Sequence, residues 1–458
     1  MIQETDILII GGGSAGFGAA YRAVKSGECT VTVVEQNPGF GGTSTYGGVN
    51  CWEPGYGGKG VHHILAERLQ STGVASVAKT TAFVTEQTPW GVSKCCDEPY
   101  YETLERSFRD GLQQRRFQFE PQNMAEEMLR LIQENDTEHR VNILFSSVAT
   151  DVELEDRKIT AITVRTPQGD VRILPKIVLD CSGDIVIARK AGCAFSIGED
   201  SQLMYDEPNA PDNPQQLING LTQVFRVTPC DPEYVDEIPS EYADVDLTQW
   251  KNALYATNRP VSCFNYYPNG DININMLPTL PGETWLEWSP QEVAHVAQAR
   301  VYAYWNWVQT KKQFRGYRIK KIFPMLGIRE SYRLIGRYVL KEQDLRNGYS
   351  CELGASHTIA YADHPADIHG RTNKSGGATM FAPYGIPYEC MLPKEIDNML
   401  VACRGASFSH IASSSARLSR TMMALGEAAG EAAVQCIRTN RMPDQVDIAD
   451  LRDKLDIS

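Results

Sequence analysis

The sequence has neither an excess of basic residues nor an apolar run long enough to cross a membrane. Its 458 residues include 44 Lys and Arg against 57 Asp and Glu, a formal net charge of −13. An acidic surface repels phosphate backbones and anionic lipid surfaces. No apolar segment approaches the roughly 18 residues that a transmembrane helix requires. We therefore expect no nucleic-acid partner and no membrane span.

Signals for export, disulfides and metal are also missing. The N-terminus MIQETDILIIGGG shows no basic segment followed by an apolar stretch and a cleavage site, which favours a cytoplasmic protein. The 12 cysteines form no CxxC motif, so we expect reduced thiols and no iron–sulfur cluster. His357, His364 and His369 fit no usual zinc spacing, so no metal site is predicted.

A glycine-rich motif stands between the first strand and the first helix that the sequence predicts. The apolar run DILII precedes Gly11, Gly13 and Gly16 in the pattern GxGxxG, and Glu35 ends the next β-branched run. Gly11 allows a tight turn, Gly13 lets the backbone approach a pyrophosphate, and Gly16 lets the helix pack closely on the strand. Glu35 can accept hydrogen bonds from ribose hydroxyls. This βαβ unit predicts a dinucleotide site.

Further elements follow along the chain. We expect a helix over 121–135, a hairpin within 158–180 that leads into a buried strand, a helix within 299–314 and a long small-residue helix over about 413–438. Residues 200–320 are richer in Pro, Asn, Asp and Trp, which indicates a separate region. In the last helix Gly426 and Gly430 are predicted to permit close packing.

Several blocks together resemble a known family. GGTSTYGGVN at 41–50, LDCSGD at 179–184, GIRESYRLIGRYVLKEQDL at 327–345 and the segment 397–433 are similar to FAD-dependent oxidoreductases of the glutathione-reductase-like superfamily, distantly similar to fumarate reductase flavoproteins. The resemblance implies an α/β fold with a discontinuous, Rossmann-like FAD-binding domain of the GR2 type and an inserted α+β substrate domain. The expected boundaries are 1–200 (with a small excursion near 90–110) and 396–458 for the FAD-binding domain and 201–395 for the substrate domain.

The resemblance also assigns the cofactor site. It implies that FAD contacts Gly11, Gly13, Ser14, Ala15, Gly16, Glu35, Gly41, Gly42, Thr43, Ser44, Val148, Ser182, Gly183, Asp184, Arg404, Ser414 and Ser415. The serines at 413–415 would begin the last helix beside the flavin pyrimidine, where a helix N-terminus favours the negative charge of reduced flavin. Some relatives attach FAD through a histidine near 43–45, where this chain has Thr-Ser-Thr, so we expect non-covalent FAD.

Candidate catalytic residues follow from chemistry near the flavin. His369 or His410 would exchange the substrate proton, and Arg329 would anchor a carboxylate or hydroxyl-rich substrate. Asn50, Trp52 and Glu53 would line the substrate side of the ring. Arg329, Arg333 and Arg337 are spaced four apart, so on a helix they would form one basic stripe.

The expected reaction is two-electron hydride transfer between flavin N5 and a small polar substrate. Oxidation of a CH–OH group, in a sugar or hydroxy acid, is one hypothesis. Reduction of an activated C=C, as in fumarate reductase, is the other, and it requires a close cluster of arginine and histidine. A flavin electron-transfer subunit is a third reading. The sequence leaves the electron acceptor and any homo-oligomer open.

Overall fold

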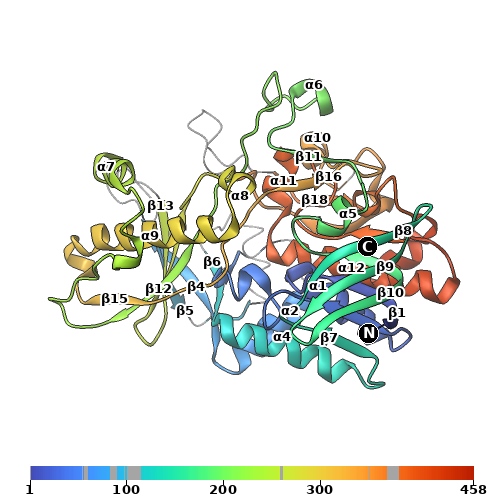
Figure 1. Ribbon diagram of the computed structural model, residues 1–458, viewed down its shortest axis with the longest axis horizontal. Coiled ribbons are helices and arrows are strands. Elements are labelled where there is room, and N and C mark those ends of the chain that lie inside the picture. The colour runs from blue at the N-terminus through green and yellow to red at the C-terminus, as the bar shows by residue number, and fades with distance from the viewer. Residues whose placement is uncertain are drawn as a thin grey trace.

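The computed structural model is a mixed α/β protein built on two large sheets that lie in adjacent halves of the molecule (Figure 1). It describes residues 2–53, 55, 60–82, 90–96, 98–100, 115–257, 261–349, 351–368 and 381–457. No helix within these ranges is long and apolar enough to cross a membrane.

The first sheet is largely parallel and contains the predicted βαβ unit. Strand β1 (Ile2–Ile10) lies between β2 (Val31–Val34) and β10 (Gly169–Asp180) and is parallel to both. Strands β7 (Val141–Leu144) and β19 (Met399–Val401) extend the parallel part. The sheet continues through an antiparallel meander of β10, β9 (Lys158–Thr166) and β8 (Val148–Glu155), which confirms the predicted hairpin. The carboxyl ends of its parallel strands meet at one edge, so the turns that follow them converge there.

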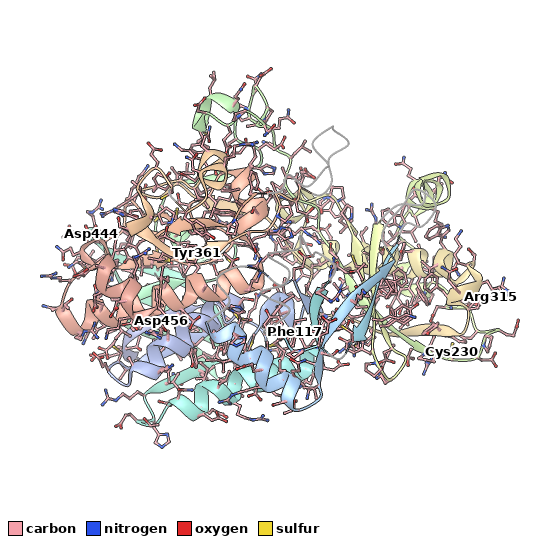
Figure 2. All side chains as sticks on the ribbon, turned by 180° about the vertical axis from the view of Figure 1, so that it is seen from behind. Phe117, Cys230, Arg315, Tyr361, Asp444 and Asp456 are labelled. Atoms are coloured by element: carbon pink, nitrogen blue, oxygen red, sulfur yellow. The ribbon has the colours of Figure 1, made fainter. Side chains whose placement is uncertain are left out.

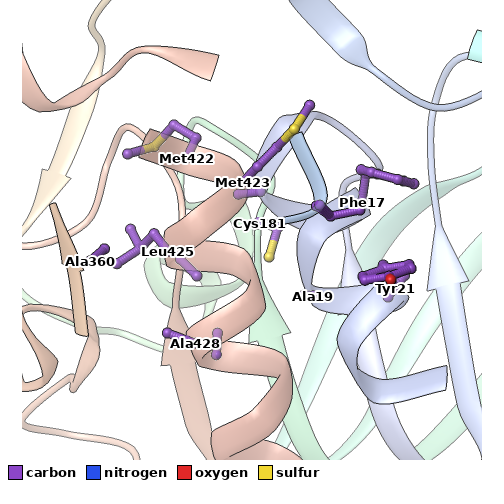
Figure 3. Packing of buried hydrophobic residues seen from close by; sticks show 14 of the residues in the cluster. Phe17, Ala19, Tyr21, Cys181, Ala360, Met422, Met423, Leu425 and Ala428 are labelled. Carbon is purple, nitrogen blue, oxygen red and sulfur yellow. The ribbon is translucent and has the colours of Figure 1, made fainter. Parts of the chain in front are cut away.

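Two helices that pack on this sheet lie unusually close to each other. Helices α1 (Ser14–Ser26) and α12 (Ser419–Thr439) lie side by side in Figure 3. A Cβ at Gly426 would lie 1.9 Å from the carbonyl oxygen of Ala15, and a Cβ at Gly430 would lie 2.5 Å from that of Ala19. The prediction that Gly426 and Gly430 permit close packing is confirmed.

The prediction of one long helix over about 413–438 is wrong in one respect, because the structure has two helices there. Helix α11 (His410–Ala416) ends before α12 begins at Ser419. Leu418 between them has extended backbone, with φ −63° and ψ 148°. Residues 413–415 therefore lie inside α11 and do not begin the last long helix.

The predicted basic stripe is also wrong. Arg333 lies in the short strand β16 (Tyr332–Leu334), which pairs with β11 (Phe195–Ile197). Its guanidinium is fully buried and forms ion pairs with Glu330 and Asp200. The arginine spacing indicated a helix, but strand pairing and buried ion pairs determine the local structure here.

The remaining elements of this half surround the first sheet. They are α2 (Val61–Ser71), α4 (Pro121–Asn135), α5 (Val186–Lys190), α6 (Gln202–Tyr205), α10 (Glu342–Asn347), β17 (Thr358–Ala362), β18 (Tyr384–Pro387) and α13 (Ile448–Lys454). Helix α4 has the predicted bounds, with a proline in its first turn, where the missing N–H costs no hydrogen bond.

The second sheet has eight strands, most of them antiparallel. Their order is β15 (Tyr317–Ile322), β12 (Val224–Pro229), β14 (Ile272–Leu277), β13 (Val261–Tyr266), β5 (Trp90–Cys96), β4 (Ala75–Ala82), β6 (Arg115–Phe119) and β3 (Cys51–Trp52). Helix α9 (Pro290–Gln309) covers one face, with α7 (Thr248–Thr257) and α8 (Thr284–Glu287) beside it. Trp305, Tyr304 and Phe225 fill the core between α9 and the sheet. Figure 2 shows this half from behind, with Phe117 near the junction and Arg315 at the outer end.

The chain passes between the two halves more often than the expected boundaries allow. Four strands of the second sheet, β3 to β6, come from residues 51–119. Leu340, Ile359 and Tyr384, expected in the substrate domain, lie in the core of the first half. Strand pairing joins segments distant in sequence, and no local pattern specifies which sheet a short strand enters.

Candidate functional site

A cavity of about 380 Å³ opens at the carboxyl edge of the first sheet and reaches the second sheet. One end is formed by the glycine-rich turns after β1 and β10. The other end is formed by polar and charged side chains from both halves. Its described lining includes Gly11, Gly13, Ser14, Ala15, Glu35, Gly42, Thr43, Trp52, Glu53, Arg116, Ser182, Gly183, Thr222, Cys263, Arg329, His364, Asp367, Arg404, Arg417, Ser419 and Arg420.

The first glycine turn has the geometry its residues suggest. Gly11 has φ +96°, and a Cβ there would lie 2.6 Å from the carbonyl oxygen of Cys181. A Cβ at Gly16 would lie 1.7 Å from the carbonyl oxygen of Gly11. Gly13 has nothing within 4 Å of its Cβ position, so the space beside it is open to a ligand.

Glu35 closes the adjacent wall of the cavity. Its carboxylate accepts hydrogen bonds from the N–H of Gly12 at 2.5 Å and from the N–H of Asn37 at 2.8 Å. Burial raises the pKa of Glu35, and these N–H groups oppose the rise. With a further bond from the Asn37 side chain at 2.6 Å, these contacts fix the carboxylate beside the turn and leave a lone pair of Oε2 for another donor.

The second turn, residues 181–184 after β10, is fixed by Asp180, the last residue of that strand. Its buried carboxylate accepts hydrogen bonds from the N–H groups of Ser182, Ile187 and Ala188. Arg404 lies across this turn, where a Cβ at Gly183 would come 2.2 Å from its Nη1 atom. Arg404 forms an ion pair with Asp184.

At the far end of the cavity, His364 faces a carboxylate. Its Nδ1 atom lies 2.7 Å from the carbonyl oxygen of Pro365, and because a carbonyl only accepts, Nδ1 donates. Its Nε2 atom lies 3.2 Å from Oε2 of Glu53. Burial would raise the pKa of Glu53, but the His364 contact and the charge of Arg116 lower it to about 2. Glu53 is therefore ionised and lies within ion-pair distance of His364.

Two guanidinium groups lie at the same end. Arg329 donates to the carbonyl oxygen of Gly220 at 3.0 Å and to the hydroxyl of Thr222, and it forms no ion pair among the described residues. Arg417 donates to the carbonyl oxygen of Asp367 at 2.9 Å and lies 3.7 Å from the Asp367 carboxylate, while its buried Nη1 atom has no hydrogen-bond partner in the described structure. Burial and the charge of Arg417 lower the pKa of Arg329 to about 10.

Comparison with known proteins assigns the chain to a family. A family model described as FAD dependent oxidoreductase matches residues 6–455. The chain belongs to this family. It is therefore an enzyme, an FAD-dependent oxidoreductase, and the expectation of FAD is confirmed.

Individual relatives are more distant. A 3-oxosteroid 1-dehydrogenase of Rhodococcus opacus is 42% identical over 53 residues, which cover 12% of this chain and only 10% of that protein. A geranylgeranyl bacteriochlorophyll reductase-like protein from Thermoplasma acidophilum is 11% identical, with a TM-score of 0.46, covering 100% of this chain and 83% of that chain. A p-nitrophenol 4-monooxygenase from Pseudomonas putida is 11% identical, with a TM-score of 0.48, covering 96% and 82%. The likeness to fumarate reductase flavoproteins stays a prediction.

The glycine-rich end of the cavity fits the FAD of this family. The Ser14 hydroxyl is buried at the start of α1 without a hydrogen-bond partner among the described residues. It lies beside open space at Gly13, where the first N–H groups of α1 are free to bind phosphate. The buried Nε atom of Arg404, on the opposite turn, also has no partner in the described structure.

The cavity includes most of the predicted cofactor residues but not all of them. Gly16 and Gly41 shape the turns, and Ser44 is buried with its hydroxyl 3.0 Å from that of Ser419. Val148 lies on β8, 43% exposed, and is not part of the lining. The Ser414 hydroxyl donates to the Ile411 carbonyl within α11, and Ser415 bonds Tyr384 and the His364 carbonyl, so neither lines the cavity. Ser419, at the start of α12, occupies the place predicted for residues 413–415.

Of the three predicted substrate residues, two line the cavity and one does not. Trp52 and Glu53 line the cavity. Asn50 is buried and donates to the hydroxyl of Tyr267 at 2.7 Å, while its oxygen accepts from Asn265 and Asn273. It ties β3 to the strands around β14 and does not line the described cavity.

Of the predicted catalytic residues that the structure describes, only Arg329 lies in this cavity. His410 lines a second cavity, and its Nδ1 atom lies 2.8 Å from the Glu330 carboxylate. His369 lies outside the described residues. No group of three or more potential metal ligands occurs among the described residues.

Sequence reasoning did not assign His364, Arg116, Arg417 or Arg420 to the site. Arg417 and Arg420 stand in the segment RLSR at the break between α11 and α12. A break in an apparently continuous helix pattern was the missing signal, because it brings these side chains to the cavity.

Proposed function

We propose that this flavoprotein oxidises the CH–OH group of a small hydroxy acid. The observation that carries the proposal is the pair Arg329 and Arg417, two largely buried guanidinium groups at one end of the cavity. Each retains N–H groups that the described residues do not use. A buried cation without a full set of partners is costly, and a carboxylate would satisfy both arginines.

The proton chemistry is assigned to His364. With Nδ1 held by the Pro365 carbonyl, Nε2 is the nitrogen that exchanges a proton. It takes the hydroxyl proton, and Glu53 at 3.2 Å stabilises the imidazolium that forms. FAD, when bound, supplies the acceptor for the hydride.

Reduction of a C=C bond conjugated to a carboxylate is the second candidate. The observation that favours it is the cluster of Arg116, Arg329, Arg417 and Arg420 with His364 around one end of the cavity. Protonated His364, paired with Glu53, would then donate the proton.

Anaerobic visible spectra of the purified FAD-loaded protein test both candidates. We expect 2-hydroxy acids to bleach the oxidised flavin band, and their amides or parent alcohols to do so about tenfold less effectively. Arg329→Gln should raise the half-saturating acid concentration about tenfold or more, whereas Arg315→Gln, at the outer end of the second sheet, should leave it unchanged. Reoxidation of chemically reduced enzyme by 2-enoic acids would select the second candidate. If amides and acids act equally, the anion site is wrong.

A further inference from the structure

The cavity of about 380 Å³ that contains the glycine turns and Arg329 is the flavin cavity. A second cavity, of about 310 Å³, lies outside it and shares no described lining residue with it. Its walls come from residues 217–218, α7, the segment 278–283 after β14, α9, the first residue of α11, and the single residues Glu199 and Ile368. Leu217, Ile218, Leu280 and two prolines give it a mainly apolar lining.

Arg300 of α9 lines this cavity and has no anionic partner among the described residues. Its Nη1 atom donates to the carbonyl oxygen of Thr279 at 2.9 Å, and its guanidinium lies 4.7 Å from the ring centroid of Trp250. It forms no ion pair with any described residue, and burial lowers its pKa. The rest of its fork of N–H groups is free for an acceptor.

Trp250 adds a second donor at the same place. Its indole Nε1 atom is buried and has no hydrogen-bond partner among the described residues. A buried indole N–H normally finds an acceptor, because leaving it unpaired costs about 1–3 kcal/mol in general. The two neighbouring side chains thus present unused donors and no acceptor.

Two carboxylates also line the cavity, and each has a contact among the described residues. The Glu283 carboxylate accepts the N–H of Ile218 at 3.1 Å. Glu199 lies 3.4 Å from Nε2 of His410, whose other nitrogen contacts Glu330. At the end of the cavity where Arg300 and Trp250 lie, the unused groups are donors, and they suit an acceptor with negative charge attached to an apolar body.

We propose that this cavity binds a small carboxylic acid with an aromatic or branched apolar body. The carboxylate pairs with Arg300 and accepts the Trp250 indole N–H. The apolar body lies against Leu217, Ile218 and Leu280. The volume is at the low end of the range for small-molecule sites, which limits the ligand to one ring or a short branched chain. This site is independent of the reaction proposed for the flavin cavity.

Fluorine NMR of 4-fluorobenzoate with the FAD-loaded protein tests the proposal. We expect saturable binding, with 4-fluorobenzamide binding about tenfold more weakly because it lacks the charge. Arg300→Gln should weaken binding of the acid about tenfold and abolish the preference over the amide. Trp250→Phe, which keeps the ring face under Arg300, should weaken it by a smaller factor.

Two controls locate the probe. Arg315→Gln, an exposed arginine of the same half, should leave binding unchanged. Arg329→Gln, in the flavin cavity, should also leave it unchanged. Binding lost in Arg329→Gln but kept in Arg300→Gln would place the probe in the flavin cavity and overturn the proposal. Absence of saturable binding, or equal binding of acid and amide, would overturn it as well. If Arg300→Gln does not fold, Trp250→Phe alone decides, since it removes the indole N–H and keeps an aromatic ring.

Discussion

The carboxylate of Glu427 on α12 accepts a hydrogen bond of 3.0 Å from the backbone N–H of Val61, the first residue of α2. Burial raises the pKa of Glu427 to about 7, while this N–H and the charges of Arg22 and Lys25 oppose the rise. The side chain thus joins two helices and titrates near neutral pH.

The raised pKa predicts a specific loss of stability with pH. Between its ordinary pKa of 4.5 and about 7, the folded protein keeps the Glu427 proton that the unfolded chain has lost. The stabilisation that the raised pKa of Glu427 gives the folded protein is fully present below about pH 4.5 and decreases as the pH rises toward 7. In Glu427→Gln the free energy of unfolding, measured by urea titration, should fall about 1–3 kcal/mol less over this range. Exposed Glu126→Gln is the control, and an equal pH slope in both variants would contradict the prediction.

Gly426→Ala should destabilise the protein. The added methyl would lie 1.9 Å from the Ala15 carbonyl oxygen, so α1 and α12 must separate. We expect a loss of about 1–3 kcal/mol or more in the free energy of unfolding of the FAD-free protein. Unchanged urea midpoints would show that the helices can move apart without cost.

Gly13→Ala should leave the fold intact and weaken FAD binding. The Cβ of residue 13 meets nothing within 4 Å and points into space that the cofactor needs. Its φ of −65° suits alanine, so the urea midpoint of the FAD-free protein should not change. The dissociation constant for FAD, from flavin fluorescence quenching, should rise about tenfold or more. Wild-type affinity in this variant would remove the glycine turn from the cofactor site.

Arg333→Met should be among the most damaging single substitutions. The guanidinium is fully buried, 3.0 Å from Asp200 and paired with Glu330, so its removal takes the guanidinium away from two buried carboxylates, of which Glu330 keeps its contacts with His410 and Asn219. We expect a loss of about 3–5 kcal/mol in chemical denaturation. Arg165→Met breaks a pair with Asp170 whose side chains are 66% and 55% exposed, and should cost less than about 1 kcal/mol. Comparable losses in both variants would contradict this ranking.

The cofactor should leave the protein on denaturation. The segment Thr43-Ser44-Thr45 offers no histidine for covalent attachment. Precipitation with acid should therefore release all flavin into the supernatant, where its absorbance can be compared with the total. A yellow pellet that retains the flavin after washing would show a covalent bond.

Local sequence patterns identified the glycine turn, the acid after β2 and the bounds of α4, because these depend on backbone conformation and neighbouring hydrogen bonds. Gly11 requires a positive φ, and Gly16 and Gly426 stand where a Cβ has no room. Because only glycine meets such requirements, it stands at fixed spacings that can be recognised in the sequence. The same patterns could not reveal that residues 51–119 supply strands to the second sheet, since pairing partners lie far along the chain.

The sequence by itself predicted a flavoprotein, which the family match confirms, and a dinucleotide site at the N-terminal glycine turn, which stays a prediction. Only the tertiary structure decided which charged side chains meet beyond it. His410 and His364 look alike as motif residues, yet packing against Glu330 takes the first to a second cavity and contact with Glu53 brings the second into the flavin cavity. Arg329 and Arg417 meet because a loop and a helix break converge there. Which side chains line a cavity depends on how distant segments pack, and this cannot be predicted from a residue's type and its neighbours in the sequence.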